Sequence, residues 1–188
     1  KQVAEDLQQE LPHLKTFATL SPLPGFAATL RAAARNSHRD FSRTRLEALL
    51  QEHAEPLRQA SGGERPVEAL MALLARPDMP RDVLAEPLQA LALAYLSLLP
   101  REPDIFDAVA RFHLANGARL ERINVFADES TARLEESFNV MVNYLYDPDE
   151  VIANHEDFVG SGHVAMSRSL QREQKKLAAV WNAAAAPA

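Results

Sequence analysis

A serine, a histidine and a tyrosine are the side chains of this sequence whose positions best suit chemistry. Ser21 lies in TFATLSPLPGF, residues 16–26, between an apolar, β-forming run and a helical pattern. Pro22 and Pro24 restrict the backbone on either side of Leu23. The hydroxyl of Ser21 is therefore either an ordinary turn or cap group or a hydrogen-bond donor held in a fixed direction. Taken alone, Ser21 is better interpreted as the turn or cap group.

His113 and two tyrosines offer a proton donor and phenol groups elsewhere in the chain. His113 precedes LANGAR at the expected end of a helix, and Tyr144 and Tyr146 lie in NYLYD, residues 143–147. An imidazole has an ordinary pKa of about 6.5 and exchanges a proton near neutral pH. Each residue also has a structural interpretation: His113 interacts with the helix dipole, and the tyrosines pack with a polar tip. Singly, none of them indicates a reaction.

Composition and motifs argue against several other classes of site. The 188 residues include no cysteine and carry a net charge of -6, so thiolate chemistry is excluded and a nucleic-acid surface is not expected. The apolar run from Leu88 to Leu99 is too short to cross a membrane. HEDFV at 155–159 lacks the second histidine of a zinc motif, and no glycine-rich phosphate loop or GxSxG serine motif is present. We expect no metal and no cofactor.

Hydrophobic spacing predicts a helix-rich α/β (α+β) fold in one domain. We expect β-strands over 15–21 and 119–127, and helices over 1–11, 24–35, 36–104 (several, with loops), 105–114, 128–146, 151–158 and 164–181. Pro24 suits the first turn of its helix, and Pro56 should interrupt another. Two strands are too few for an independent sheet. They either pair with each other beneath the helices or join strands that this chain does not contain.

Three segments together point to a family. TLSPLPGF, FHLANGARLERIN and VMVNYLYD occur in this order and at these separations, and the combination resembles malonyl-CoA decarboxylase. The first resembles LSPIPGF, the second resembles FHLxNGAxLxxIN followed by Ala-Asp (here Ala127 and Asp128), and the third resembles LMxNYxY. The resemblance extends from near residue 5 to near residue 180. Val125 differs, since the family often has an aromatic residue there.

The resemblance implies a fold and a domain arrangement. Residues 1–188 would form the C-terminal part of a catalytic domain like the acyl-CoA N-acyltransferase (GNAT) fold, with 36–104 as a helical insertion. A separate N-terminal helical domain, the first strands, the loop that binds the CoA pyrophosphate and an acidic active-site residue would lie upstream, outside this chain. We therefore expect the chain by itself to be inactive.

The resemblance also implies a reaction and its residues. The family converts malonyl-CoA to acetyl-CoA and carbon dioxide without a metal or an organic cofactor. Its active-site serine, histidine and tyrosine correspond to Ser21, His113 and Tyr146. The expected partners are malonyl-CoA, the N-terminal remainder of the same protein and further copies in a homo-oligomer, with no nucleic acid and no membrane. The chain ends in AAPA without a Ser-Lys-Leu signal, so we expect the cytoplasm.

Two other functions stay open at this point. Another acyl-CoA enzyme of the same fold, an N-acyltransferase, would transfer an acetyl group to an amine and would not need Ser21 or His113 for decarboxylation. A non-catalytic helical assembly module would use residues 36–104 for binding and would have no reason to bring Ser21, His113 and Tyr146 together.

Overall fold

The computed structural model describes residues 17–100, 102 and 106–185, so the helix predicted over 1–11 lies outside the described part. In chain order the elements are β1 (Phe17–Pro22), α2 (Phe26–Ala34), α3 (Arg43–Leu49), the 3₁₀ turn η1 (Gln51–His53), α4 (Ala54–Ser61), α5 (Pro66–Leu74), α6 (Arg81–Leu98), α7 (Ala108–Ala115), β2 (Arg119–Asn124), α8 (Thr131–Ser137), β3 (Met141–Tyr146), α9 (Val151–Ser161) and α10 (Arg168–Ala183). The helix-rich α/β prediction is confirmed.

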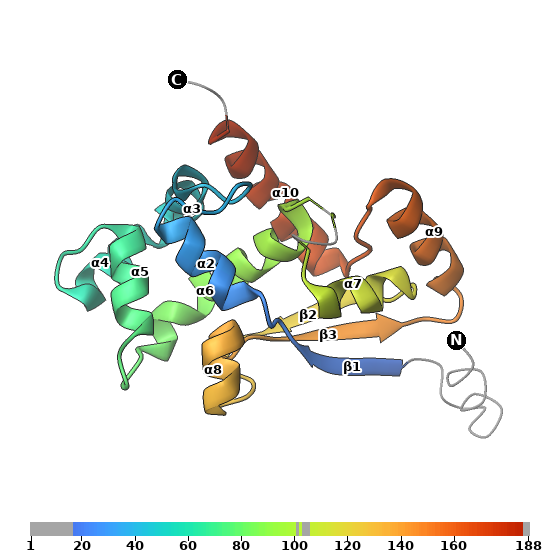
Figure 1. Ribbon diagram of the computed structural model, residues 1–188, viewed down its shortest axis with the longest axis horizontal. Coiled ribbons are helices and arrows are strands. Elements are labelled where there is room, and N and C mark those ends of the chain that lie inside the picture. Colours follow the sequence, from blue (N-terminus) through green and yellow to red (C-terminus); the bar gives the residue numbers. More distant parts are fainter. Residues whose placement is uncertain (1–16, 101, 103–105, 186–188) are drawn as a thin grey trace.

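A small antiparallel sheet organises the described residues. Its strand order is β1-β3-β2, so the last strand in sequence lies between the other two (Figure 1). Ser21 pairs with Val142 across the first ladder, and Ile123 pairs with Val142 across the second. The segment 165–167 lies beside β2: Leu120 C=O accepts from Ser167 N–H, and Leu120 N–H donates to Ala165 C=O. The two predicted strands are thus real, but they pair with β3 and not with each other.

The helix predicted over 128–146 is confirmed as far as Ser137 but wrong beyond it, and the reason is a coincidence of spacing. Leu134, Phe138, Met141 and Leu145 follow a helical period, but α8 ends at Ser137. Phe138 and Asn139 then adopt the left-handed conformation, with φ of 51° and 62°, which stops a helix. The following MVNYLY is rich in β-forming residues and becomes the central strand.

Two proline predictions also need correction. Helix α2 begins at Phe26 with Gly25 as its N-cap, so Pro24 precedes the helix instead of occupying its first turn. Pro56 does not interrupt a helix, because it lies in the first turn of α4, where the missing N–H costs no hydrogen bond. The actual break is the 3₁₀ turn before it. The other helix ends differ from prediction by a few residues.

Between residues 36 and 104 every described regular element is a helix or a 3₁₀ turn, joined by short loops, and α6 runs through the centre of the molecule (Figure 1). Helices α3, α4 and α5 lie at one end and α9 lies at the other (Figure 1). From Leu91 to Leu96 helix α6 buries side chains on every side, as this apolar run predicts, whereas Arg81, Asp82, Glu86 and Gln89 earlier in the helix are exposed. None of the helices in the described ranges is long and apolar enough to cross a membrane.

Candidate active site

Ser21 lies near the end of β1 on the face of the sheet that the helices cover. Along β1 the side chains alternate, so Thr19 and Ser21 are at least partly covered while Ala18 and Leu20 are exposed. The chain then turns, with Phe26 N–H donating to Leu23 C=O at 3.1 Å. Leu23 is fully buried. The end of β1 is therefore anchored on both sides of Pro22, and the Ser21 hydroxyl is held against the interior.

His113 comes from the last turns of α7. The helix starts at Asp107, whose side chain accepts from the N–H groups of Val109 and Ala110. It ends at Asn116, and Gly117 follows with φ of 82°. His113 faces the sheet and is only 8% exposed. The predicted stop at Asn116-Gly117 is confirmed, and it sets how far α7 extends across the sheet.

Tyr146 ends β3, on the same face as Ser21 but at the other end of the ladder. It pairs with Phe17, four residues along β3 from the Val142 that pairs with Ser21. At roughly 3.3 Å per residue, this is about 13 Å along the strand. The two side chains therefore need a group between them, and the imidazole of His113 occupies that position.

The three predicted residues form one hydrogen-bonded chain. Ser21 Oγ lies 3.0 Å from His113 Nε2, and His113 Nδ1 lies 2.8 Å from the hydroxyl of Tyr146. Ser21 Oγ also lies 3.1 Å from Thr19 Oγ1. A neutral imidazole donates from one nitrogen and accepts at the other. When Nε2 carries the proton, Tyr146 donates to Nδ1, Nε2 donates to Ser21, and Ser21 donates to Thr19.

Burial sets the protonation of the ring and the phenols. Removal from water lowers the pKa of His113 below its ordinary value and raises the pKa of Tyr146, because burial disfavours each charged form. Tyr144 stacks on the imidazole, with centroids 4.4 Å apart and planes at 16°. Burial, followed by the charge of Asp107, raises the pKa of Tyr144 well above its usual range. Both tyrosines are therefore neutral at pH 7.

Sequence reasoning missed two residues of this environment, Thr19 and Asp107, and gave Tyr144 only a packing role. Thr19 bonds Ser21 from the same strand face, Tyr144 covers one face of the imidazole, and Asp107 caps the helix that carries His113. Period-two spacing along β1 would have indicated Thr19, and period-two spacing along β3 would have grouped Tyr144 with Tyr146. Asp107 stands before an apolar helical run, which is a capping signal.

A cavity of about 640 Å³ lies beside the β1–α2 turn. Pro24, Gly25, Tyr95 and Asp107 contribute to its wall, but Ser21, His113 and Tyr146 do not. Within the described ranges no group of three or more histidine, aspartate or glutamate side chains is placed to hold a metal ion. Ser21, His113 and Tyr146 carry two hydroxyl groups and an imidazole, so they can donate hydrogen bonds and transfer protons. A developing oxyanion requires this chemistry.

Residues 1–185 match the family model described as the malonyl-CoA decarboxylase C-terminal domain. The chain belongs to the malonyl-CoA decarboxylase family. Among curated proteins it is 33% identical over 176 residues to the mitochondrial malonyl-CoA decarboxylase of Rattus norvegicus. It is 30% identical over 177 residues to that of Anser anser anser. Each match covers 90% of this chain. The predicted membership of this family is thus confirmed.

Solved structures of malonyl-CoA decarboxylases share the fold. The structure from Cupriavidus metallidurans is 37% identical with a TM-score of 0.73, and the match covers 92% of this chain and 42% of that one. The structure from Rhodopseudomonas palustris is 35% identical with a TM-score of 0.68, covering 91% and 38%. The chain spans 35% of the length of the rat protein.

Proposed function

We propose that this chain supplies Ser21, His113 and Tyr146 to the conversion of malonyl-CoA into acetyl-CoA and carbon dioxide. The observation that carries the proposal is the hydrogen-bonded chain Ser21–His113–Tyr146, built from residues 92 and 33 positions apart in sequence. Membership of the malonyl-CoA decarboxylase family supports the substrate. A helical assembly module would have no need to bring these three groups together.

Carbon–carbon cleavage comes first in the proposed mechanism. The electron pair of the bond to the carboxylate moves into the thioester, carbon dioxide leaves, and negative charge develops on the thioester oxygen. The Ser21 O–H turns from Thr19 to that oxygen and donates a hydrogen bond to it. One such donor contributes on the order of 10²–10³ in rate. The thioester itself accepts the electrons.

Protonation of the enolate carbon completes the reaction and consumes one proton. His113 Nε2 lies at the end of the chain nearest Ser21 and gives its proton to the carbon. Burial lowers the pKa of the free imidazole, but an anionic substrate beside it favours the protonated ring. Tyr146 holds Nδ1 at 2.8 Å and so fixes the direction of the ring. A positioned acid contributes roughly 10²–10⁴ in rate.

The test is acetyl-CoA formation from malonyl-CoA by the full-length protein. Ser21→Ala and His113→Asn should each lower kcat by about two decades or more. Matched controls are Ser137→Ala, a buried serine that bonds Arg133 C=O, and His155→Asn, a histidine that bonds Ala115 C=O. Both controls should keep kcat. Near-normal rates for Ser21→Ala and His113→Asn would contradict the proposed roles.

The domain arrangement is part of the same proposal. The sheet would be the C-terminal part of a GNAT-like fold, with 36–104 as a helical insertion, and upstream strands and a CoA phosphate loop would complete it. The share of the relatives that this chain covers supports this arrangement. The isolated chain should then be inactive. Robust malonyl-CoA turnover by residues 1–188 would disprove the requirement for the upstream segments. Acetyl transfer to an amine without malonyl-CoA turnover would favour the N-acyltransferase.

Assembly and compartment also stay predictions. We expect a homo-oligomer, which light scattering on the full-length protein would test. We expect the protein in the cytoplasm, whereas the curated relatives are named as mitochondrial. Fractionation of cells that express the full-length protein would decide between these compartments.

A further inference from the structure

We propose that Asp107 is a positioning residue that sets the distance and direction between Ser21 and His113. This inference rests on the proposed decarboxylation, because it assigns Asp107 a role at that same site. Asp107 contacts neither side chain directly. It joins the turn that follows Ser21 to the helix that carries His113.

The carboxylate of Asp107 is buried, with 4% of the residue exposed, and accepts four hydrogen bonds. Oδ1 accepts from Val109 N–H at 3.0 Å and from Ala110 N–H at 3.1 Å. Oδ2 accepts from Gly25 N–H at 3.2 Å and from the Tyr95 hydroxyl at 3.1 Å. One oxygen therefore belongs to α7, and the other belongs to α2 and α6.

The hydrogen bonds of Asp107 and His113 connect β1, the turn after it and α7 into a closed ring of contacts. From Ser21 the backbone passes through Pro22 and Pro24 to Gly25, whose N–H is held by Asp107. From Asp107 helix α7 extends six residues to His113, about 9 Å at 1.5 Å per residue. The hydrogen bond from His113 to Ser21 closes the ring. Two prolines and a helix make most of the ring stiff, so the Asp107–Gly25 contact decides whether the last bond forms.

The chemistry of the junction requires a carboxylate. Four donors converge on one side chain, and only a carboxylate offers acceptor oxygens on both sides. Burial and the charge of Asp107 raise the pKa of Tyr95, so the phenol keeps its proton and remains a donor. No cation lies within ion-pair distance of Asp107 among the residues that the structure describes. The hydrogen bonds must therefore offset the cost of burying the charge.

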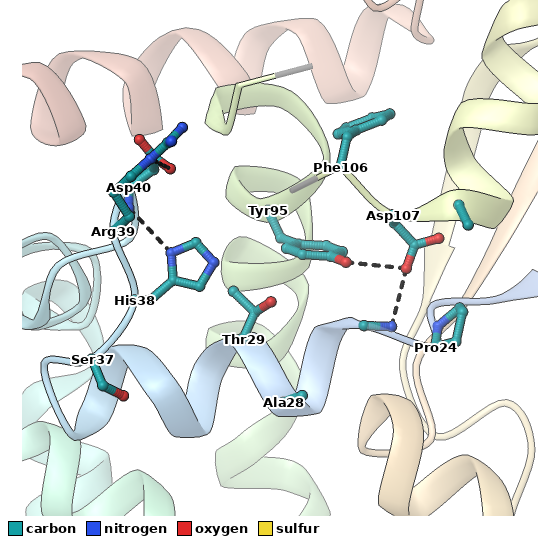
Figure 2. Close-up of a pocket in the computed structure, with 12 residues that line it drawn as sticks. Pro24, Ala28, Thr29, Ser37, His38, Arg39, Asp40, Tyr95, Phe106 and Asp107 are labelled. Carbon is teal, nitrogen blue, oxygen red and sulfur yellow. Dashed lines mark hydrogen bonds and ion pairs between the residues drawn. The ribbon is translucent and has the colours of Figure 1, made fainter. Parts of the chain in front are cut away.

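The junction also leaves little room for adjustment. Figure 2 shows the Asp107 carboxylate between Tyr95 and the backbone after Pro24, at the edge of the cavity. A Cβ atom added at Gly25 would lie 2.6 Å from the Tyr95 hydroxyl and 3.5 Å from Asp107 Oδ2. A side chain at Gly25 would therefore crowd the Tyr95 hydroxyl and shift one of the four donors of Asp107.

The decisive variant is Asp107→Asn in the full-length protein. An asparagine can still cap α7 through its oxygen, but its NH₂ group faces the N–H of Gly25 and the hydroxyl of Tyr95. We expect kcat for malonyl-CoA to fall about 10- to 100-fold with little change in KM, because a misplacement of about 1 Å can cost that much. The control Ser130→Ala removes the cap of α8 and should keep kcat.

A second readout does not depend on activity. ¹⁵N-NMR of the His113 ring, assigned with His113→Asn, reports the hydrogen bonds at Nε2 and Nδ1. Asp107→Asn should change the Nε2 signal, whereas Ser130→Ala should not. If the wild-type protein fails to turn over malonyl-CoA, the proposed function fails, while the NMR comparison still decides the positioning role. An unchanged kcat together with an unchanged Nε2 signal would overturn the inference.

A folding failure would not end the test. If Asp107→Asn does not fold, Tyr95→Phe takes its place, since it removes one donor and leaves the carboxylate bound to Gly25 and α7. We expect a loss of a few-fold in kcat at unchanged KM, with a smaller change at Nε2. Wild-type values for both quantities in a folded Tyr95→Phe protein would equally overturn the inference.

Discussion

The hydroxyl of Tyr144 gives the sharpest test of how the site is packed. Tyr144 is fully buried, and its hydroxyl has no hydrogen-bond partner among the described residues. A buried polar group without a partner costs roughly 1–3 kcal/mol. Tyr144→Phe removes that group and keeps the ring. We therefore expect this variant to unfold with a free energy about 1 kcal/mol higher than the wild type.

The ring of Tyr144 should behave in the opposite way. It stacks on His113 at 4.4 Å, and an aromatic pair contributes about 0.5–1.5 kcal/mol beyond the area that it buries. Tyr144→Leu loses that stacking and leaves a cavity, so we expect a loss of about 2–3 kcal/mol. Water reaching the imidazole should also raise the pKa of His113 toward its ordinary value.

Urea unfolding of both variants, together with NMR titration of His113, measures these effects. The expected order of stability is Tyr144→Phe, then wild type, then Tyr144→Leu. A Tyr144→Phe protein less stable than the wild type by 1 kcal/mol or more, a value typical of a lost hydrogen bond, would show that the hydroxyl is bonded. Tyr144 would then not be a buried phenol without a partner. An unchanged pKa of His113 in Tyr144→Leu would refute the shielding role of the ring.

Three further predictions concern the same region. Gly117→Ala should destabilise the protein by roughly 3 kcal/mol or more in urea unfolding, because φ is 82° and an added Cβ would meet Val151 C=O at 2.0 Å; a loss below about 1 kcal/mol would contradict this. His113 has a lowered pKa when folded, so its contribution to stability is present above about pH 6.5 and is lost as the pH falls toward the folded pKa. His113→Asn should flatten this part of a plot of unfolding free energy against pH. An unchanged slope in the variant would argue against this contribution of His113. Thr19→Val should lower kcat several-fold, since Ser21 loses its 3.1 Å partner, whereas Thr19→Ser should restore it; equal rates in all three proteins would remove Thr19 from the site.

The sequence was informative where local rules and tertiary structure agree. The strand that carries Ser21, the helices between 36 and 104 and the stop at Gly117 follow from period, proline and glycine signals. Strand β3 was missed because its apolar residues continue a helical spacing, and because a central strand is stabilised by partners distant in sequence. Tyr146 was found through the resemblance of its segment to a family, although the helix assigned to it was wrong.

Contacts across the site could not be predicted in the same way. The bond between Ser21 and His113 joins positions 92 residues apart, and Asp107 meets Gly25 across 82 residues. Nothing in the local sequence encodes such distances. The sheet order, with β3 between β1 and β2, and the packing of α7 and α2 around it bring these segments together.

That strand order has a consequence for synthesis on the ribosome. Pro22 ends β1 and pairs with Met141, which is made 119 residues later (141 − 22). At about 5–20 residues per second, β1 waits roughly 6–24 s for its partner. Helices α4 and α5 pack mainly on each other and can form during that interval, while the nascent β1, with Leu20 on its outer face, lacks its β3 partner and is prone to non-native strand pairing. A chaperone that shields this segment during translation would therefore raise the yield of correctly folded protein.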